Sequence, residues 1–424
     1  MKKILYVILD GLGDRPVAEL GNRTPLEAAR APHMDRLAAQ GRQGLVQTVG
    51  EGIAPESDVA VMAILGYDPH RYHTGRGPIE AVGAVVSLHD GDLALRGNFA
   101  TLGEGWRIVD RRAGRDLTAE EIQAFADAVN RDVMLAGAHL EMRATIGHRC
   151  VVVISAEDGA LSADITNTDP AYGRLGGLGV AKAISGPLEV EESRPIKEDP
   201  RADRAADLVN AFTRQCRDVL EHHPLNAQRR AQGKMPANII LLRDAGDHLP
   251  PVPSMRDAFG VDFACFVEMP VERGIARLLG MSMVEVPPSG RDPARVYPQW
   301  AAKAADALKK HGGVYLHLKG PDEPGHDGDF QGKTQSIEWI DAHFFGEVLP
   351  KIDLRETVVA ITADHATPCV LKGHSADPVP LLISGGGVEP DGAGPFGEQA
   401  GAKGALGKMR GVDVIPLLVR LAGA

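Results

Sequence analysis

The sequence has little of several features that mark common classes of protein. Only 4% of its 424 residues are aromatic, and basic residues are not in excess. Its 46 lysines and arginines face 57 aspartates and glutamates, for a net charge of −11. This balance argues against a general nucleic-acid or membrane-surface binder, because both of those surfaces are anionic. An anionic small molecule would therefore need a local cluster of basic side chains.

Cysteines and long apolar runs are equally scarce. The four cysteines stand far apart with no C-x-x-C pair, which fits reduced cytoplasmic thiols better than a disulfide framework or a zinc knuckle. No apolar stretch reaches the roughly 18 residues of a membrane span. The N-terminal MKKILYVILD is short, stops at Asp10 and lacks a small-residue cleavage site, so we interpret it as a strand and not a signal peptide. We expect a cytoplasmic protein without nucleic-acid or membrane partners.

The chain does contain an alternation of apolar strands and amphipathic helices. Its length exceeds what one core usually supports, so two domains are expected. Predicted core strands cover residues 3–9, 263–267, 313–318, 357–361 and 379–383. Helices between them are typical of an α/β fold with a mostly parallel sheet covered on both faces. Shorter, polar-alternating strands break this pattern, so we expect a core of residues 1–85 and 245–424 and an inserted, smaller α+β domain at 86–244.

Metal-binding residue types gather in one late stretch. Residues 362–374 read TADHATPCVLKGH, follow an apolar β-branched run, and carry Asp364, His365 and His374. A carboxylate and two imidazoles at the mouth of a buried strand predict a metal site. Cys369 lies between the two histidines and is a softer candidate ligand.

Two other strand ends carry the same residue types. Asp10 ends the first strand, and KGPDEPGH after residues 313–318 places Asp322 and His326 four residues apart, in what we expect to be a loop. Open parallel sheets bind ligands beyond the carboxyl ends of their strands, so all of these side chains can meet in one crevice. Together they supply three carboxylates and three imidazoles, enough for two metal sites with open positions for substrate.

Each of these residues also has an ordinary explanation. A single Asp at a strand end is commonly a helix N-cap or a turn former. The segment Asp322–His326 could be a solvated turn, in which Asp327 and Asp329 compete as ligands. The metal interpretation is favoured because unrelated caps need not recur with histidines at three strand ends.

Ser57 is the candidate nucleophile. The sequence GEGIAPES followed by DVAVMAILG predicts a helix that starts near Ser57 and stops at Gly66. Amides and dipole at a helix N-terminus favour an incoming phosphate, and a metal ion activates a serine hydroxyl. Without a metal, the simpler interpretation is that Ser57 only caps its helix.

Taken in order, these motifs resemble those of the archaeal-type 2,3-bisphosphoglycerate-independent phosphoglycerate mutases, members of the alkaline phosphatase superfamily. The resemblance covers nearly the whole chain through GIAPESDVAVMAILGYDP, GRGPIEAVG, KGPDEPGHDG, TADHATPC and GHSADPVP. It implies an alkaline-phosphatase-like core with a cap domain. It also implies that the chain interconverts 3-phosphoglycerate and 2-phosphoglycerate, in glycolysis and gluconeogenesis, through a phosphoserine at Ser57.

The resemblance further implies two divalent metal ions, manganese first, with zinc, cobalt or magnesium as alternatives. Positions that match the ligands of one ion are Asp10, Ser57, Asp364 and His365. Positions that match the ligands of the other are Asp322, His326 and His374.

The insertion resembles the smaller domain that grips the substrate carboxylate and hydroxyl. An arginine fork matches a carboxylate or phosphate with two bonds, which lysine cannot do. Asp110 is the candidate acid/base at the glycerate hydroxyls, by analogy with larger relatives in the family. Any one arginine is otherwise an ordinary solvated charge, although DRRAGR places four charges within six residues. The candidate substrate-binding residues are Asn98, Arg111, Arg112, Arg115, His148, Arg149 and Arg243.

Other functions stay open at this point. A phosphomonoesterase would use the same site but hydrolyse the phosphoserine, and a related enzyme would move phosphate on homoserine or a sugar. A sulfatase is disfavoured because APESDVA lacks the Cys/Ser-x-Pro-x-Arg pattern. A non-catalytic metal-stabilised sensor or scaffold would have lost a ligand or the nucleophile, whereas every expected position is filled. The sequence is compatible with a homo-oligomer.

Overall fold

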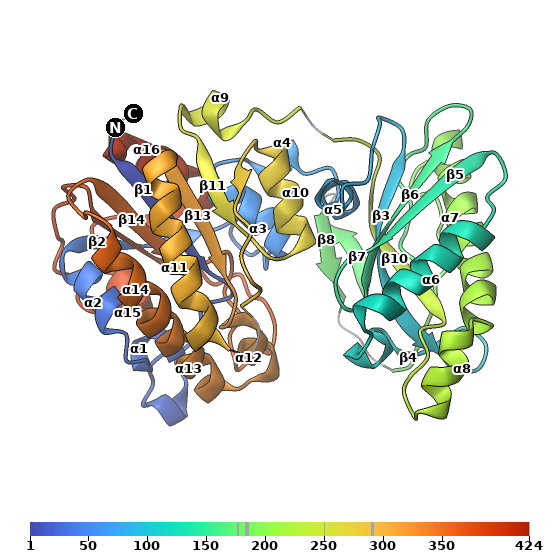
Figure 1. Ribbon diagram of the computed structural model, residues 1–424, viewed down its shortest axis with the longest axis horizontal. Helices are drawn as coiled ribbons and strands as arrows, with labels where there is room; N and C mark the ends of the chain where they lie inside the picture. The colour runs from blue at the N-terminus through green and yellow to red at the C-terminus, as the bar shows by residue number, and fades with distance from the viewer. Residues whose placement is uncertain (176–177, 183–185, 250, 290–291, 424) are drawn as a thin grey trace. The chain divides into compact units, whose positions relative to one another are not determined.

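The computed structural model describes residues 1–423 apart from 176–177, 183–185, 250 and 290–291. The chain forms two compact units, which are coloured along the sequence in Figure 1 and are treated separately below. Unit 1 comprises Met1–Tyr72, Val252–Glu268 and Ala276–Ala424. Unit 2 comprises His73–Pro251 and Met269–Ile275. The insertion expected at residues 86–244 lies within unit 2, which extends further at both ends.

Unit 1 is built on an eight-stranded sheet in the order β12-β11-β13-β1-β14-β15-β2-β16. Adjacent strands are parallel except where β15 runs against β14 and β2. The predicted mostly parallel sheet is therefore confirmed. The strand bounds are β1 Lys3–Leu9, β2 Gly41–Gln47, β11 Phe263–Phe266, β12 Ser282–Met283, β13 Gly313–Leu318, β14 Thr357–Thr362, β15 Val379–Gly385 and β16 Gly407–Arg410.

Helices cover both faces of this sheet (Figure 1). The central strands β1, β13 and β14 are buried along almost their whole length. Their sequences are continuous apolar runs because neither face meets water. The α-helices of unit 1 are α1 Pro25–Ala28, α2 Pro32–Ala39, α3 Ser57–Ile64, α4 Pro69–Tyr72, α9 Met255–Phe259, α11 Pro293–Lys310, α12 Asp322–Asp327, α13 Phe330–Ile340, α14 Gly346–Val348, α15 Glu398–Gly401 and α16 Val414–Ala422.

Unit 2 holds an antiparallel sheet in the order β5-β6-β3-β4-β9, with β10 also paired to β3, and a separate β7–β8 pair. Helices α6 and α7 pack on it through an apolar cluster that includes Phe99, Phe125 and Phe212. The strands are β3 Leu93–Leu102, β4 Arg107–Asp110, β5 Ala138–Ala144, β6 Arg149–Ala156, β7 Tyr172–Leu175, β8 Leu178–Ala181, β9 Leu188–Glu189 and β10 Ile239–Gly246. The helices are α5 Arg76–Gly83, α6 Ala119–Asp132, α7 Pro200–Glu221, α8 Pro224–Ala231 and α10 Pro270–Leu278, whose last residues belong to unit 1.

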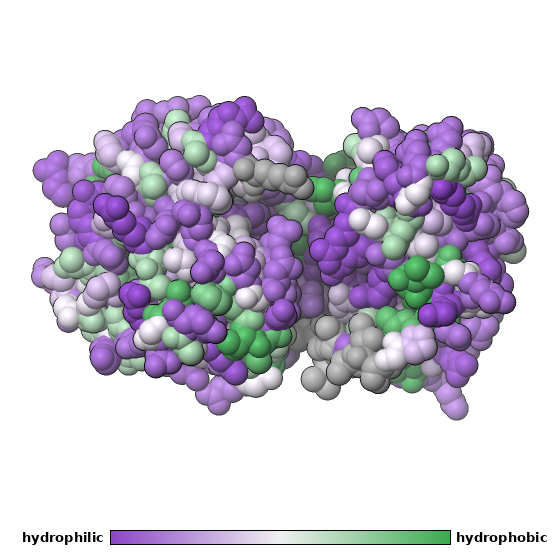
Figure 2. All heavy atoms as spheres, turned by 90° about the horizontal axis from the view of Figure 1, so that it is seen from below, coloured by the Kyte–Doolittle hydropathy of each residue, from purple (hydrophilic) through white to green (hydrophobic). Residues whose placement is uncertain are grey.

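The surface is mainly polar. In the face shown in Figure 2, hydrophilic side chains prevail and apolar ones form small patches. All four cysteines are buried and free. Within the described ranges, none of the helices combines the length and the apolar character needed to cross a membrane.

Candidate active site

Three strands of unit 1 bring acidic side chains to one edge of the sheet. β1 lies between β13 and β14 and is parallel to both, so their carboxyl ends meet at the same edge. Atoms of Asp10, Asp364 and His365 lie within 4.8 Å of one another. Atoms of Asp322, His365 and His374 meet the same limit. The structure thus gathers five of the residues that the spacing predicts as metal ligands.

The first group is buried, and one oxygen of each of its two carboxylates has no hydrogen-bond donor. His365 Nε2 lies 3.2 Å from Asp364 Oδ2 and 3.5 Å from Asp10 Oδ1. Neither of these two carboxylate oxygens accepts a hydrogen bond from the described residues. A buried polar atom left in this way is costly, so a native protein normally supplies a partner. The partner that suits two carboxylates and one imidazole is a divalent cation.

Electrostatics separate the two carboxylates. Burial opposes the ionisation of Asp10, but Lys319, whose Nζ donates to Asp10 Oδ2 at 2.7 Å, and the nearby His317 outweigh it. Together they hold the pKa of Asp10 well below its ordinary range. For Asp364, burial prevails and repulsion by Asp10 adds to it, which raises the pKa of Asp364 to about 7. Burial also lowers the pKa of His365, which favours the neutral imidazole that metal binding requires.

His317 and Lys319 were missed at the sequence level. His317 lies inside β13, is fully buried, and places Nε2 3.7 Å from Asp10 Oδ1 and 3.6 Å from Asp364 Oδ2. His317 and Lys319 stand near the end of GVYLHLKG, which is otherwise apolar, and these two polar residues are the sequence feature that could have identified them.

The second group lies around Asp322. Nε2 of His374 is 3.7 Å from Asp322 Oδ1, and Nε2 of His326 is 3.6 Å from Asp322 Oδ2. The Nδ1 atoms bond instead to backbone carbonyls, that of His374 to Pro55 at 2.8 Å and that of His326 to Lys372 at 3.3 Å. Since a carbonyl only accepts, each Nδ1 donates its proton, and Nε2 is the nitrogen of each ring that faces Asp322.

The loop expected around Asp322 is wrong, because residues Asp322–Asp327 form helix α12. Pro324 is tolerated there because it lies in the first turn, where its missing N–H has no helical partner. The four-residue spacing then places Asp322 and His326 on one helix face. Gly11 makes room for this helix: its φ is +63°, and a Cβ at that position would lie 2.6 Å from Asp322 Oδ1.

Ser57 is the first residue of α3 and Glu56 holds the N-cap position, so the interpretation of Ser57 as a simple cap is wrong. Its Oγ lies 3.3 Å from His365 Nε2, the same atom that faces Asp10 and Asp364. The hydroxyl therefore borders the first group of candidate ligands.

Unit 2 contains a cluster of the opposite charge, which we call the arginine cluster: Arg96, Arg149, Arg243, Asn98 and His148. Pairing of the strands places Arg96 opposite Arg243 and Asn98 opposite Arg149. The Nε atoms of Arg96, Arg149 and Arg243 donate no hydrogen bond within the described residues. Like charges opposite each other on neighbouring strands are unfavourable, so this arrangement suits a bound anion.

The electrostatics of the arginine cluster agree with an excess of positive charge. Burial and Arg243 lower the pKa of Arg96 to about 9. Burial and Arg149 lower the pKa of His148 to about 3, so this imidazole is neutral. Glu80 offsets part of the charge, at 3.4 Å from Arg96 Nε. Arg96 and Glu80 were not predicted from the sequence, because their meeting depends on strand pairing and on α5.

The DRRAGR segment is arranged differently from the arginine cluster. Arg111 binds Asp169 with two bonds of 3.1 and 2.6 Å, so its Nε and Nη2 already have a carboxylate partner. Arg112 is half-buried and Arg115 is exposed. Asp110 ends β4, and its Oδ1 accepts a bond from the Arg112 amide at 2.6 Å.

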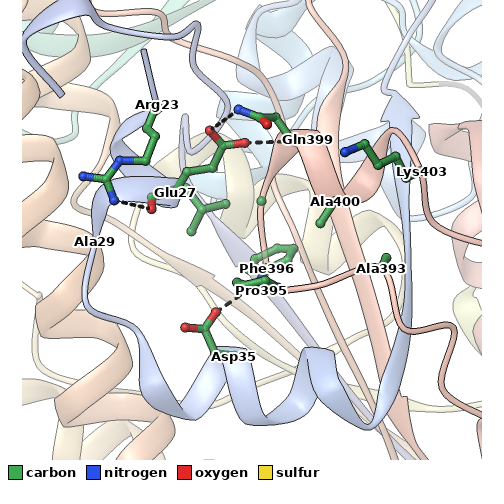
Figure 3. A pocket seen from close by; sticks show the side chains of 12 residues that line it. Arg23, Glu27, Ala29, Asp35, Ala393, Pro395, Phe396, Gln399, Ala400 and Lys403 are labelled. Carbon is green, nitrogen blue, oxygen red and sulfur yellow. Dashed lines mark hydrogen bonds between the residues drawn. The ribbon is translucent and has the colours of Figure 1, made fainter. Parts of the chain in front are cut away.

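A separate cavity of about 310 Å³ in unit 1 is drawn in Figure 3. Glu27 accepts bonds from Gln399, and Asp35 accepts one from the Phe396 amide. These polar groups hold the segment 393–403 against α1 and α2, so their hydrogen bonds explain them without a ligand. The cavity is lined by Arg23, Leu26, Glu27, Ala29, Asp35, Ala393, Pro395, Phe396, Gly397, Gln399, Ala400 and Lys403.

Two solved structures share the α/β fold of this chain over nearly their whole length. The chain is similar to the PH0037 protein from Pyrococcus horikoshii, with 34% identity, a TM-score of 0.80, and coverage of 99% of this chain and 97% of that one. It is also similar to a cofactor-independent phosphoglycerate mutase from Thermoplasma acidophilum, with 34% identity, a TM-score of 0.66 and complete coverage of both chains.

Sequence comparison defines the family. Residues 38–226 match the family model described as 2,3-bisphosphoglycerate-independent phosphoglycerate mutase. The relative of that name from Aeropyrum pernix is 44% identical and the one from Methanopyrus kandleri 40% identical; they are covered over 99% and 96% of their lengths, and each match covers 99% of this chain. The chain belongs to the 2,3-bisphosphoglycerate-independent phosphoglycerate mutase family, which confirms the resemblance seen in its motifs.

Proposed function

We propose that this chain interconverts 3-phosphoglycerate and 2-phosphoglycerate without 2,3-bisphosphoglycerate, as an isomerase of glycolysis and gluconeogenesis. Relatives that carry this name match it over nearly their whole length. The observation that carries the proposal is the position of Ser57 Oγ, 3.3 Å from the His365 nitrogen that faces two buried carboxylate oxygens without donors. A serine so placed is suited to take up a phosphoryl group.

The side chains fit two divalent cations. Asp10 and Asp364 each have one buried oxygen without a hydrogen-bond donor, and two imidazoles face Asp322. When bound, such ions polarise phosphoryl oxygens and neutralise the charge that develops during transfer. Manganese is the first candidate, with zinc, cobalt or magnesium as alternatives. One ion would be held by Asp10, Ser57, Asp364 and His365, and the other by Asp322, His326 and His374.

Ser57 supplies the nucleophile in the proposed reaction. A bond forms between its Oγ and the phosphorus of 3-phosphoglycerate while the bond from phosphorus to the substrate O3 breaks. The serine loses a proton and O3 gains one. In the second half, the glycerate O2 takes the phosphoryl group from phosphoserine, and the proton lost by O2 is balanced by the one that Ser57 regains. The start of α3 favours the phosphate through its amides and dipole.

The arginine cluster is proposed to hold the glycerate carboxylate. Arg149 and Arg243 offer unbonded Nε donors there, and neutral His148 can add another. Asn98 has its Oδ1 unbonded and contributes its side-chain N–H groups to the proposed site. Holding the glycerate during the interval between the two phosphoryl transfers prevents its loss. Exclusion of water protects phosphoserine from hydrolysis. Arg112 and Arg115 are proposed to assist binding, as is Arg111 despite its bonds to Asp169. Asp110 is the proposed acid/base at the glycerate hydroxyls.

The test is to incubate the manganese-loaded chain with 3-phosphoglycerate alone and to follow the products by phosphorus NMR. We expect 2-phosphoglycerate to accumulate to an equilibrium mixture, with little inorganic phosphate. Release of inorganic phosphate without 2-phosphoglycerate would identify a phosphomonoesterase and refute the mutase proposal.

A further inference from the structure

One buried hydroxyl connects the two groups of candidate metal ligands. Thr367 is fully buried, and its Oγ1 lies 2.7 Å from Asp322 Oδ1 and 3.0 Å from His365 Nδ1. Its backbone is fixed on both sides: the amide donates to the Gly13 carbonyl at 3.0 Å, and its carbonyl accepts from Lys333 Nζ at 2.9 Å. The hydroxyl therefore has a defined position between the two groups.

The single proton of this hydroxyl determines the direction of both bonds. An ionised carboxylate only accepts, so Thr367 donates its proton to Asp322. The oxygen can then only accept from His365, and Nδ1 of His365 must carry the proton. A neutral imidazole has one N–H, so the lone pair lies on Nε2, the atom 3.2 Å from Asp364 Oδ2 and 3.5 Å from Asp10 Oδ1.

This direction resolves an ambiguity in the distances. By proximity alone, His365 belongs both to the group of Asp10 and Asp364 and to the group of Asp322 and His374. The Thr367 bond occupies Nδ1, which is the His365 nitrogen on the Asp322 side, at 4.0 Å from Asp322 Oδ1. His365 is thereby assigned to Asp10 and Asp364.

We propose that Thr367 is a positioning residue that fixes the Nδ1–H tautomer of His365 and couples the orientation of His365 to that of Asp322. The inference rests on the metal binding in the proposed function. Thr367 acts through those two side chains and not on the substrate. Partners of this kind, which orient a metal ligand by a hydrogen bond, typically change metal affinity by about 10–100-fold when removed.

Two substitutions separate the hydroxyl from the shape of the side chain. Thr367→Val removes the hydroxyl and keeps the branched shape, while Thr367→Ser keeps the hydroxyl and removes the methyl group. Manganese-loaded full-length protein would be dialysed against buffers of graded free Mn²⁺, and bound metal measured by atomic emission. We expect Thr367→Ser to retain metal as the wild type does, and Thr367→Val to need about 10–100-fold more free Mn²⁺ for at least one ion.

The Co²⁺-loaded chain gives a second readout, because its visible absorption reports ligand geometry. The spectrum should change for Thr367→Val and not for Thr367→Ser. If Thr367→Val does not fold by circular dichroism, Thr367→Ala replaces it and the same loss is expected.

The inference is overturned if a folded variant without the hydroxyl retains both ions over the wild-type range of free Mn²⁺. It is also overturned if Thr367→Ser loses metal as Thr367→Val does. Absence of bound metal from the wild type would refute the metal part of the proposed function together with this inference. A wild type that binds two ions but makes no 2-phosphoglycerate would refute the mutase reaction alone.

Discussion

Unit 1 and unit 2 each contain a cluster of polar side chains in which some buried atoms have no hydrogen-bond partner. The unbonded atoms are acceptors of acidic groups in unit 1 and donors of basic groups in unit 2. In unit 1, Asp10 and Asp364 present oxygens that accept no hydrogen bond from the described residues, whereas in unit 2 the Nε atoms of Arg96, Arg149 and Arg243 donate none. Buried groups of this kind are normally satisfied, so we expect the first cluster to bind cations and the second an anion. The proposed reaction on a phosphorylated carboxylic acid with divalent metals would supply both.

The largest effect is expected at the serine that borders the acidic cluster. Ser57→Ala removes the phosphoryl acceptor, so turnover should fall by on the order of 10⁴-fold or more, as for other covalent nucleophiles. The assay is formation of 2-phosphoglycerate at saturating 3-phosphoglycerate. Ser254→Ala is the control, since Ser254 only caps α9. Retained mutase activity in Ser57→Ala would remove the nucleophile assignment.

The next effect tests the need of unit 1 for cations. Asp364→Asn keeps the shape of the side chain and removes the charge of one of the two carboxylates that have an oxygen without a hydrogen-bond donor. We expect loss of one bound ion per chain and a fall in turnover on the order of 10³-fold. Chelation of the wild type should abolish turnover, and added Mn²⁺ should restore it. Asp353→Asn is the control, because Asp353 is bonded to Arg355 at the surface. Unchanged metal content in Asp364→Asn would contradict the cation interpretation.

The third test compares two buried arginines of unit 2 that differ in their hydrogen bonding. Arg229 is bonded to Asp116 and Glu121, whereas Arg243 lies over the Tyr172 ring with its Nε unbonded. Arg243→Met should raise KM for 3-phosphoglycerate at least tenfold, because a charge-assisted bond to the carboxylate is lost.

The matched variant Arg229→Met should act on stability instead. It removes hydrogen bonds to two partly exposed carboxylates, so the free energy of unfolding should fall by about 1.5–3 kcal/mol while KM stays near the wild-type value. Urea unfolding and steady-state kinetics on both variants check the pair. Equal effects on KM would mean that the arginine cluster is not a binding site.

The sequence offers candidates for both clusters, but local pattern predicts which residues come together only for the acidic one. Asp10 and Asp364 stand directly at the ends of apolar strands, and the carboxyl ends of parallel strands share one edge, so local pattern suffices. Arg96 and Arg243 stand 147 positions apart in the sequence (243 − 96) and meet only because β3 pairs with β10 in an antiparallel register. Such a register cannot be deduced from the sequence of either segment alone.

Two smaller misses have different origins, one local and one tertiary. The run DEPGH looks like a turn because Pro and Gly dominate it, yet Pro is harmless in a first helical turn and α12 forms. The role proposed for Thr367 cannot be predicted from the sequence, because it depends on the positions of Asp322 and His365, which tertiary structure brings to one hydroxyl. Pattern identifies ligands at strand ends, but not the residues that orient them.

The smallest effect is expected at Glu398, a half-buried acid whose two oxygens both accept hydrogen bonds. Glu398 accepts bonds from the Thr24 hydroxyl at 2.7 Å and the Asp14 amide at 3.2 Å, and burial raises its pKa to about 7. Its folded pKa lies above the unfolded value, so the folded state binds the proton more tightly. Stability from this group is complete below about pH 4 and is lost as the pH rises to about 7.

The free energy of unfolding should therefore decrease less between pH 4.5 and pH 7 in Glu398→Gln than in the wild type, by about 1–3 kcal/mol. Urea unfolding of the metal-free chain at each pH measures it, with exposed Glu51→Gln as the control. Added Mn²⁺ should leave the contribution of Glu398 unchanged, because its oxygens are already bonded. A contribution that Mn²⁺ abolishes would mean that bonded carboxylates also recruit metal, and the contrast between satisfied and unsatisfied acids would fail.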